Sequence, residues 1–75
     1  MKNVKKMIVE IVKLYSASNE LDVAQITYLL HTKHIEVEPS VVVQWSQELE
    51  AEGKVQVIRD EFFPEDAFFT TIKAI

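Results

Sequence analysis

The sequence predicts an α+β domain in which a bundle of three helices is followed by a two-stranded β-hairpin. Apolar residues recur at helical spacing in three segments before Gly53, and they alternate with polar residues directly after it. The chain has 75 residues with one Gly and two Pro, which suits one small domain with few loops. We therefore expect a single domain over residues 1–75.

The first helix is expected over residues 3–17. At about 100° per residue, its apolar side chains share one broad face and its lysines share the opposite face. The apolar face holds Val4, Met7, Ile8, Ile11, Leu14 and Tyr15. The basic face holds Lys2, Lys5, Lys6 and Lys13. This pattern predicts a helix that covers the core and presents lysines outward, followed by a polar connector over residues 16–19.

The second helix has a clear start signal. Asp22 is suited to cap its first turn, and Gln25 stands at the reciprocal position of a capping box. Leu21 and Ile26 occupy the two positions of a hydrophobic staple. We expect this helix to end near Lys33.

The third helix is bounded at both ends. After a connector over residues 34–38, Pro39 suits the first turn of a helix, and Gly53 suits its C-terminal cap. The side chains expected to face the core are Val41, Val42, Trp45 and Leu49. Those expected on the exposed side are Val43, Gln44, Gln47, Glu50 and Ala51.

The last third of the chain predicts the hairpin. Residues 54–59 alternate polar and apolar side chains, as a half-buried strand does. Residues 60–66 contain Pro64 and four acids and indicate a connection, whereas residues 67–75 are rich in the Phe, Thr and Ile that favour a second strand. The predicted core of the whole domain comprises Val4, Met7, Ile8, Ile11, Leu14, Ile26, Leu30, Val42, Trp45, Leu49, Val55 and Val57.

Residues 49–55 resemble the junction between recognition helix and wing in winged helix-turn-helix transcription regulators. In that superfamily a Leu packs under the helix end, a Gly terminates the helix and an apolar residue opens the wing, and here Leu49, Gly53 and Val55 hold those places. The resemblance covers residues 3–72 and implies a winged-helix fold. It also implies DNA binding, with the third helix in the major groove and the hairpin on the backbone. The connector over residues 34–38 is longer than the turn of minimal helix-turn-helix proteins, so the angle between the second and third helices stays open.

The charge distribution argues against a strong duplex binder. The net charge of −4 divides into +3 for residues 1–19, −6 for residues 20–52 and −1 for residues 53–75. No Arg or Lys stands between Pro39 and Glu52, and such side chains supply most non-specific affinity for DNA. Gln44 and Gln47 are of a type that reads adenine edges, although both also suit a solvated helix face. Double-stranded DNA therefore remains a possible partner, and its candidate contacts are Ser40, Val43, Gln44, Gln47, Lys54 and Arg59.

The basic face of the first helix has two interpretations. It is either a solvated surface opposite the core, as amphipathic helices commonly have, or a contact for an acidic partner. Such a partner would be a nucleic-acid backbone or the acidic middle of a second copy, because segments of charge +3 and −6 attract each other.

Two aromatic pairs fall in the predicted hairpin. Neighbouring residues of a strand point to opposite faces, so one Phe of each pair would face away from the core if both pairs lay on strands. They either pack across the hairpin or form the centre of an interface with an acidic rim. We favour a protein partner or a homodimer, bound through Phe62, Phe63, Phe68 and Phe69.

No residue pattern predicts catalysis. His31 and His34 have a spacing that two metal ligands can share, but no motif fixes a third ligand. One Gly cannot form a glycine-rich phosphate loop, and no nucleophile motif is present. We expect a non-enzymatic regulatory module without cofactor, metal or small-molecule substrate. With no Cys, no stretch of about 20 apolar residues and charges at Glu10 and Lys13 where a signal peptide is apolar, we expect a cytoplasmic chain that does not bind a membrane.

Overall fold

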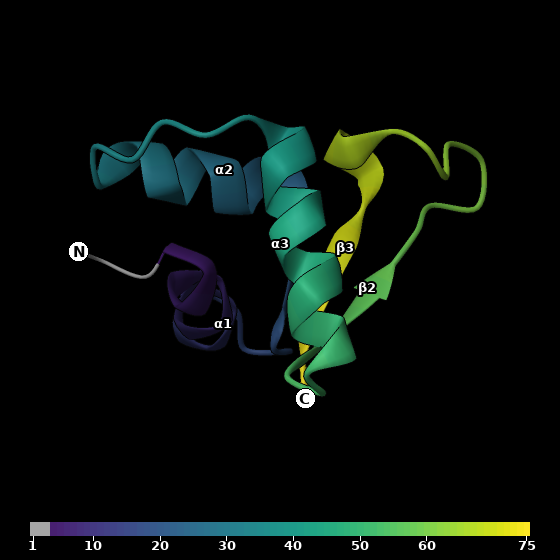
Figure 1. Cartoon of the computed structure of the whole chain (residues 1–75), viewed down its shortest axis with the longest axis horizontal. Helices are drawn as coiled ribbons and strands as arrows, with labels where there is room; N and C mark the ends of the chain where they lie inside the picture. The colour runs from purple at the N-terminus through teal and green to yellow at the C-terminus, as the bar shows by residue number, and fades with distance from the viewer. Residues whose placement is uncertain (1–3) are drawn as a thin grey trace.

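In the computed structural model, which describes residues 4–75, helix α3 lies between two other helices and a small sheet (Figure 1). The elements follow the chain as α1 (Val4–Tyr15), β1 (Glu20–Asp22), α2 (Val23–Thr32), α3 (Pro39–Ala51), β2 (Val55–Ile58), the 3₁₀ turn η1 (Ala67–Phe69) and β3 (Thr71–Ala74). Both α1 and α2 contact α3, which in turn contacts β2 and η1. The chain is thus an α+β fold with three helices and a three-stranded antiparallel sheet within residues 4–75. No helix of these residues is long and apolar enough to cross a membrane.

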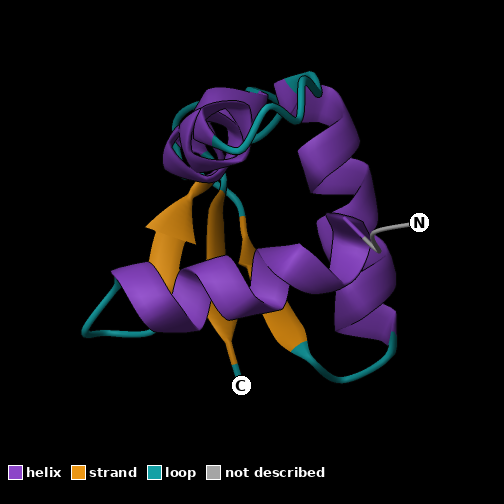
Figure 2. Cartoon of the chain, turned by 90° about the vertical axis from the view of Figure 1, so that its left-hand side faces the viewer, coloured by secondary structure: helices purple, strands orange, loops and turns teal. Residues whose placement is uncertain are grey.

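The sheet has one strand more than the sequence predicts. Its order is β1-β3-β2, and Ile72 of β3 is paired with Leu21 of β1 and with Val57 of β2. Figure 2 shows the strands of the sheet side by side. The prediction of a two-stranded sheet is therefore wrong, because β1 was not foreseen. Three residues are too few to display an alternating pattern, and Leu21 is buried against the core as one residue of that short strand.

Local signals at the ends of α2 and α3 are confirmed. The Asp22 carboxylate accepts a hydrogen bond of 2.7 Å from the Gln25 backbone N–H, and the reciprocal bond of the capping box is also present. Pro39 is the first residue of α3. Gly53 has a φ of 78°, a conformation that glycine adopts without strain. Its N–H and that of Lys54 donate to the carbonyls of Glu50 and Leu49, both at 3.0 Å, which closes the end of α3 as a Schellman motif.

The core lies where the three helices meet the sheet, and most of its predicted members are there. The predicted burial of Leu14 is wrong, since 75% of its surface is exposed. Tyr15, on the same predicted apolar face, is half exposed. On α1 the buried residues are Ile8, Ile11 and Val12. Leu14 lies about 100° away from the centre of that face, and Tyr15 is the last residue of the helix. The predicted residues that are fully or partly buried are Val4, Met7, Ile8, Ile11, Ile26, Leu30, Val42, Trp45, Leu49, Val55 and Val57.

The predicted exposure of Val43 is also wrong. Only 7% of its surface is exposed, and Ser46 on the same helix is fully buried with its hydroxyl donating 2.7 Å to the Val42 carbonyl. The reason is the central position of α3, which packs on α1 and α2 on one side and on β2 and η1 on the other. A helix covered from two sides buries a wider arc than the one-sided pattern that the sequence suggests.

The second predicted strand, residues 67–75, is shorter than expected. Its first residues form the 3₁₀ turn η1 instead, and β3 begins only at Thr71. Asp66 caps this turn by accepting a hydrogen bond of 2.9 Å from the Phe68 N–H. Phe68 and Phe69 therefore do not lie on a strand, and neither do Phe62 and Phe63, which belong to the preceding loop.

Candidate functional site

The connection between β2 and β3, residues 59–70, contains all four Phe of the chain, and we call it the aromatic hairpin. The exposed fractions are 80% for Phe62, 57% for Phe63, 56% for Phe68 and 51% for Phe69. All four aromatic candidates thus face solvent for half of their surface or more. Neither pair is on a strand, so the condition under which one Phe of each pair would face outward is not met.

Two aspartates hold the backbone of the aromatic hairpin. One carboxylate oxygen of Asp60 accepts hydrogen bonds from the N–H groups of Phe62 at 2.9 Å and Phe63 at 2.8 Å. Asp66 does the same for Phe68. The sequence places these acids in a connection and in the rim of an interface. Their role in holding the backbone was not predicted, although an Asp two residues before the amide it accepts from is a known turn signal. Their side chains fix the positions from which the aromatic rings project.

The aromatic rings are also ordered by each other. The rings of Phe63 and Phe69 stack, with centroids 5.2 Å apart and an angle of 25° between their planes. Arg59 donates a hydrogen bond of 3.3 Å to the carbonyl of Pro64 across the loop. The aromatic hairpin is therefore an ordered projection with exposed aromatic rings and four acids, Asp60, Glu61, Glu65 and Asp66.

The candidate DNA-reading face of α3 is only partly present. Ser40, Gln44 and Gln47 are exposed, as predicted, whereas Val43 is buried and unable to touch a base. Among the two cations assigned to this surface, Arg59 is exposed on the hairpin and Lys54 forms an ion pair of 3.3 Å with Glu52.

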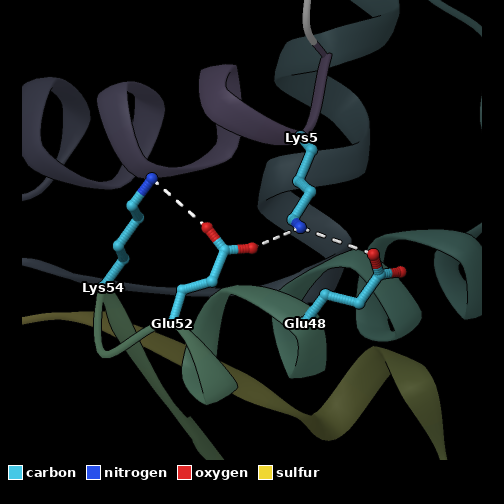
Figure 3. A network of polar contacts seen from close by, with 4 residues as sticks. All are labelled: Lys5, Glu48, Glu52 and Lys54. Carbon is cyan, nitrogen blue, oxygen red and sulfur yellow. Dashed lines mark hydrogen bonds and ion pairs between the residues drawn. The ribbon is translucent and has the colours of Figure 1, made fainter.

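A network of ion pairs joins α1 to the end of α3 (Figure 3). Lys5 Nζ donates to Glu52 Oε2 at 2.5 Å and to Glu48 Oε1 at 3.4 Å. The hydrogen bond from Lys5 holds the pKa of the Glu52 carboxyl below its usual value, and the same bond raises the pKa of the Lys5 ammonium. The acids of α3 thus meet the basic face of α1 in the same chain.

The other lysines of the predicted basic face are placed differently. Lys6 and Lys13 are exposed on α1, and Lys2 lies outside the described residues. A groove of about 430 Å³ lies between α1, the end of α3 and Ile75, and its lysines are Lys5, Lys6, Lys13 and Lys54. This groove has no counterpart in the predictions from sequence, because its residues come from distant parts of the chain.

Three outward N–H groups at the two edges of the sheet have side-chain acceptors. On β2, Glu50 Oε2 accepts from the Val57 N–H at 2.9 Å. On β1, the N–H groups of Glu20 and Asp22 donate to Ser16 Oγ at 3.2 Å and to Gln25 Oε1 at 3.4 Å. Open strand edges invite pairing with other chains, and these contacts occupy three of the N–H groups that would pair. The sheet edges are consequently poorer docking sites than the aromatic rings.

Another apolar surface, unforeseen in the sequence, lies along α2. Tyr28 is exposed and lines two shallow grooves, one shared with Tyr15 and one shared with Phe68 and Val37. The aromatic hairpin is therefore continuous with apolar surface on α2.

The two histidines are exposed, and His34 directly follows the last turn of α2 with a φ of 63°. No group of three or more His, Cys, Asp or Glu in residues 4–75 is arranged to hold a metal ion.

Comparison of the chain with protein-family models, with curated proteins and with solved structures finds no match.

Proposed function

We propose that this chain is a non-enzymatic regulatory module that binds another protein through its aromatic hairpin. The observation that supports it best is the exposure of all four Phe, between 51% and 80%, on a loop whose backbone is held by Asp60 and Asp66. Binding of a partner that covers water-exposed aromatic side chains is favoured, because their apolar surface is removed from water. Order before binding lowers the entropy that association costs.

The chemistry around the rings suits an interface. Protein interfaces combine an aromatic centre with a polar rim, and here Asp60, Glu61, Glu65 and Asp66 surround the Phe side chains along the loop. Acids at the rim also keep such a patch soluble while it is unpartnered.

We further propose that the fold belongs to the winged-helix class. The order helix, strand, two helices, strand, strand supports this class, as does the sheet order β1-β3-β2. In this description α3 takes the place of the recognition helix, and the aromatic hairpin takes the place of the wing.

DNA binding is the second candidate, because Ser40, Gln44 and Gln47 are exposed together on α3. Three features weigh against it. Glu48 lies on the same helix and Glu52 caps its end, the ammonium groups of Lys5 and Lys54 are already paired with these acids, and Val43 is buried. Phosphate contacts from Lys and Arg supply most of the affinity of a duplex binder, and α3 has none to offer.

A photo-crosslinking amino acid placed singly at Phe62 or at Gln44 separates the two candidates in the native cells. Both positions are exposed, so each reports on the surface around it. We expect discrete protein adducts from position 62 and none from position 44. Nucleic-acid adducts from position 44, with no protein adduct from position 62, would reject protein binding in favour of DNA binding.

A further inference from the structure

The groove beside α1 has the opposite character to the aromatic hairpin. Its floor is apolar, formed by Val9 of α1, Leu49 of α3 and Ile75. We call it the lysine groove, since the lysines that line it are Lys5, Lys6, Lys13 and Lys54. Its volume of about 430 Å³ gives room for a bulky apolar side chain.

The charge of the lysine groove is positive in an acidic protein. Glu10 and Glu52 are the acids among its lining residues, so four lysines leave a net charge of +2, although the whole chain has −4. Part of this positive charge is neutralised within the chain, because Lys5 and Lys54 form ion pairs with Glu52. Lys13 also lines the groove and is exposed. An anionic partner with an apolar side chain therefore fits this groove by charge and by polarity.

The aromatic hairpin has both of these properties. Phe62 is the most exposed of its rings at 80%, and it forms no ring stack of the kind that joins Phe63 to Phe69. Glu61 and Glu65 flank this region and are exposed, with no ion pair to any residue of the described chain. Residues 60–66 thus present an aromatic ring between carboxylates.

We propose that the aromatic hairpin of one copy docks into the lysine groove of a second copy, with Phe62 on the apolar floor and the acids of the hairpin beside Lys13 and Lys54. This inference rests on the proposed function and names a second copy as the partner. The two surfaces lie apart on the molecule. The loop after β2 projects at the upper right of Figure 1, whereas α1 lies at the left and the C-terminus at the bottom. Residues of α1 and the C-terminal Ile75 line the groove. A copy cannot fill its own groove, so every copy keeps one donor and one acceptor surface.

Such pairing is head-to-tail, and it differs from a two-fold dimer in a measurable way. A two-fold interface uses the same patch on both copies, whereas a head-to-tail interface joins two different patches and continues into rings or chains. Loss of either patch stops growth, but one copy without its hairpin and one copy without its groove still form a pair.

The test therefore mixes two variants. Phe62→Ser removes the inserted ring, and Lys13→Glu with Lys54→Glu reverses charge at the groove. Sedimentation equilibrium of the wild type should show association that grows with concentration, and each variant alone should associate about thirtyfold more weakly. An equimolar mixture should form heterodimers and stop there. Two controls should associate as the wild type does: Tyr15→Ser, which removes an exposed aromatic ring that lines neither surface, and Lys33→Glu with Lys73→Glu, which makes the same charge change elsewhere.

Salt provides an independent readout. Raising the ionic strength from about 0.01 M to about 1 M shortens the Debye length from about 30 Å to about 3 Å and should weaken the pairing. Amide-resolved NMR should map the contact to residues 60–66 of one copy and to the groove of the other.

Three outcomes would overturn the inference. They are a wild type that stays monomeric up to about 1 mM, a mixture that stays monomeric although the wild type associates, and a groove that responds to a short DNA duplex but not to a second copy. A crosslink from position 62 to a different protein, with no crosslinked pair of this chain, would refute the second copy as partner and leave the proposed function standing. Absence of every protein adduct from position 62 would refute both the second copy as partner and the proposed function.

Discussion

The ring of Phe63 stacks on the ring of Phe69, with centroids 5.2 Å apart, so the loop and the 3₁₀ turn of the aromatic hairpin support each other. Aromatic stacking adds about 0.5–1.5 kcal/mol beyond the burial of area. We expect Phe69→Ala to lower the free energy of unfolding by about 1 kcal/mol or more in urea denaturation. Phe62→Ala is the matched control and should cost less than about 0.5 kcal/mol, because 80% of that side chain is already exposed. Equal losses in the two variants would contradict a supporting role for the stack.

Glu50 protects the outer edge of β2 by accepting the Val57 N–H at 2.9 Å. We expect Glu50→Ala to lower the free energy of unfolding by about 1 kcal/mol and to increase aggregation at high concentration, because it frees an edge N–H to pair with another chain. Glu50→Gln retains an acceptor oxygen on a side chain of the same length, so its stability and its aggregation should stay close to those of the wild type. Light scattering and urea denaturation of the two variants provide the measurement. If Gln is as harmful as Ala, the carboxylate charge matters and the accepted hydrogen bond does not.

The ion pair of Lys5 and Glu52 makes stability depend on pH at both ends of the range. Because the Glu52 pKa is lowered by the Lys5 hydrogen bond, its contribution is complete above the pKa of the unfolded carboxyl and is lost as pH falls through the lower folded value. Because the Lys5 pKa is raised, chiefly by the same bond, its contribution is complete below the pKa of the unfolded amine and is lost as pH rises through the higher folded value. The pair is therefore fully effective from about pH 4.5 to about pH 10.

Glu52→Gln tests this dependence. We expect its urea midpoint to lie below that of the wild type at neutral pH and to approach it as pH falls through the folded pKa of Glu52. Salt should shrink the difference, since the pair is exposed to solvent. A difference between the two proteins that stays constant down to strong acid would exclude ionisation of Glu52 as its cause.

Features that depend on neighbouring residues in the sequence were predictable. The Asp22 capping box, Pro39 at the start of α3 and Gly53 at its end are all local, and the structure confirms each. Strand β1 was not predicted, because it forms only by pairing with β3, at the other end of the chain. Val43 escaped because its burial depends on the elements that cover α3 from two sides.

The same distinction applies to the candidate site. The four Phe were named from sequence, because adjacent aromatic pairs among acids stand out without any knowledge of the fold. The pairing of Lys5 with Glu48 and Glu52 was not predicted from the sequence, since nothing in the chain indicates that α1 lies against the end of α3. The lysine groove has no local signal either, because the fold assembles it from α1, α3 and the C-terminal residue.

His34 is the first residue of the predicted connector, and it occupies the position after α2 that Gly53 occupies after α3. Its φ is 63°, and its N–H and that of Ile35 donate to the carbonyls of His31 at 2.9 Å and Leu30 at 3.0 Å. A non-glycine residue in this left-handed conformation costs about 1–2 kcal/mol. Gly relieves that strain but loses more backbone entropy on folding.

We therefore expect His34→Gly to raise the free energy of unfolding by about 1 kcal/mol, with an unchanged denaturant slope, in urea titrations. Lys33→Gly is the control, because Lys33 has a φ of −100° and gains nothing from glycine. It should lower stability by about 0.5–1 kcal/mol. Asn19, with a φ of 60°, should gain less from the same change than His34, since Asn tolerates the left-handed region better. A His34→Gly variant no more stable than the wild type would contradict a strain at His34 that exceeds the entropy cost of glycine.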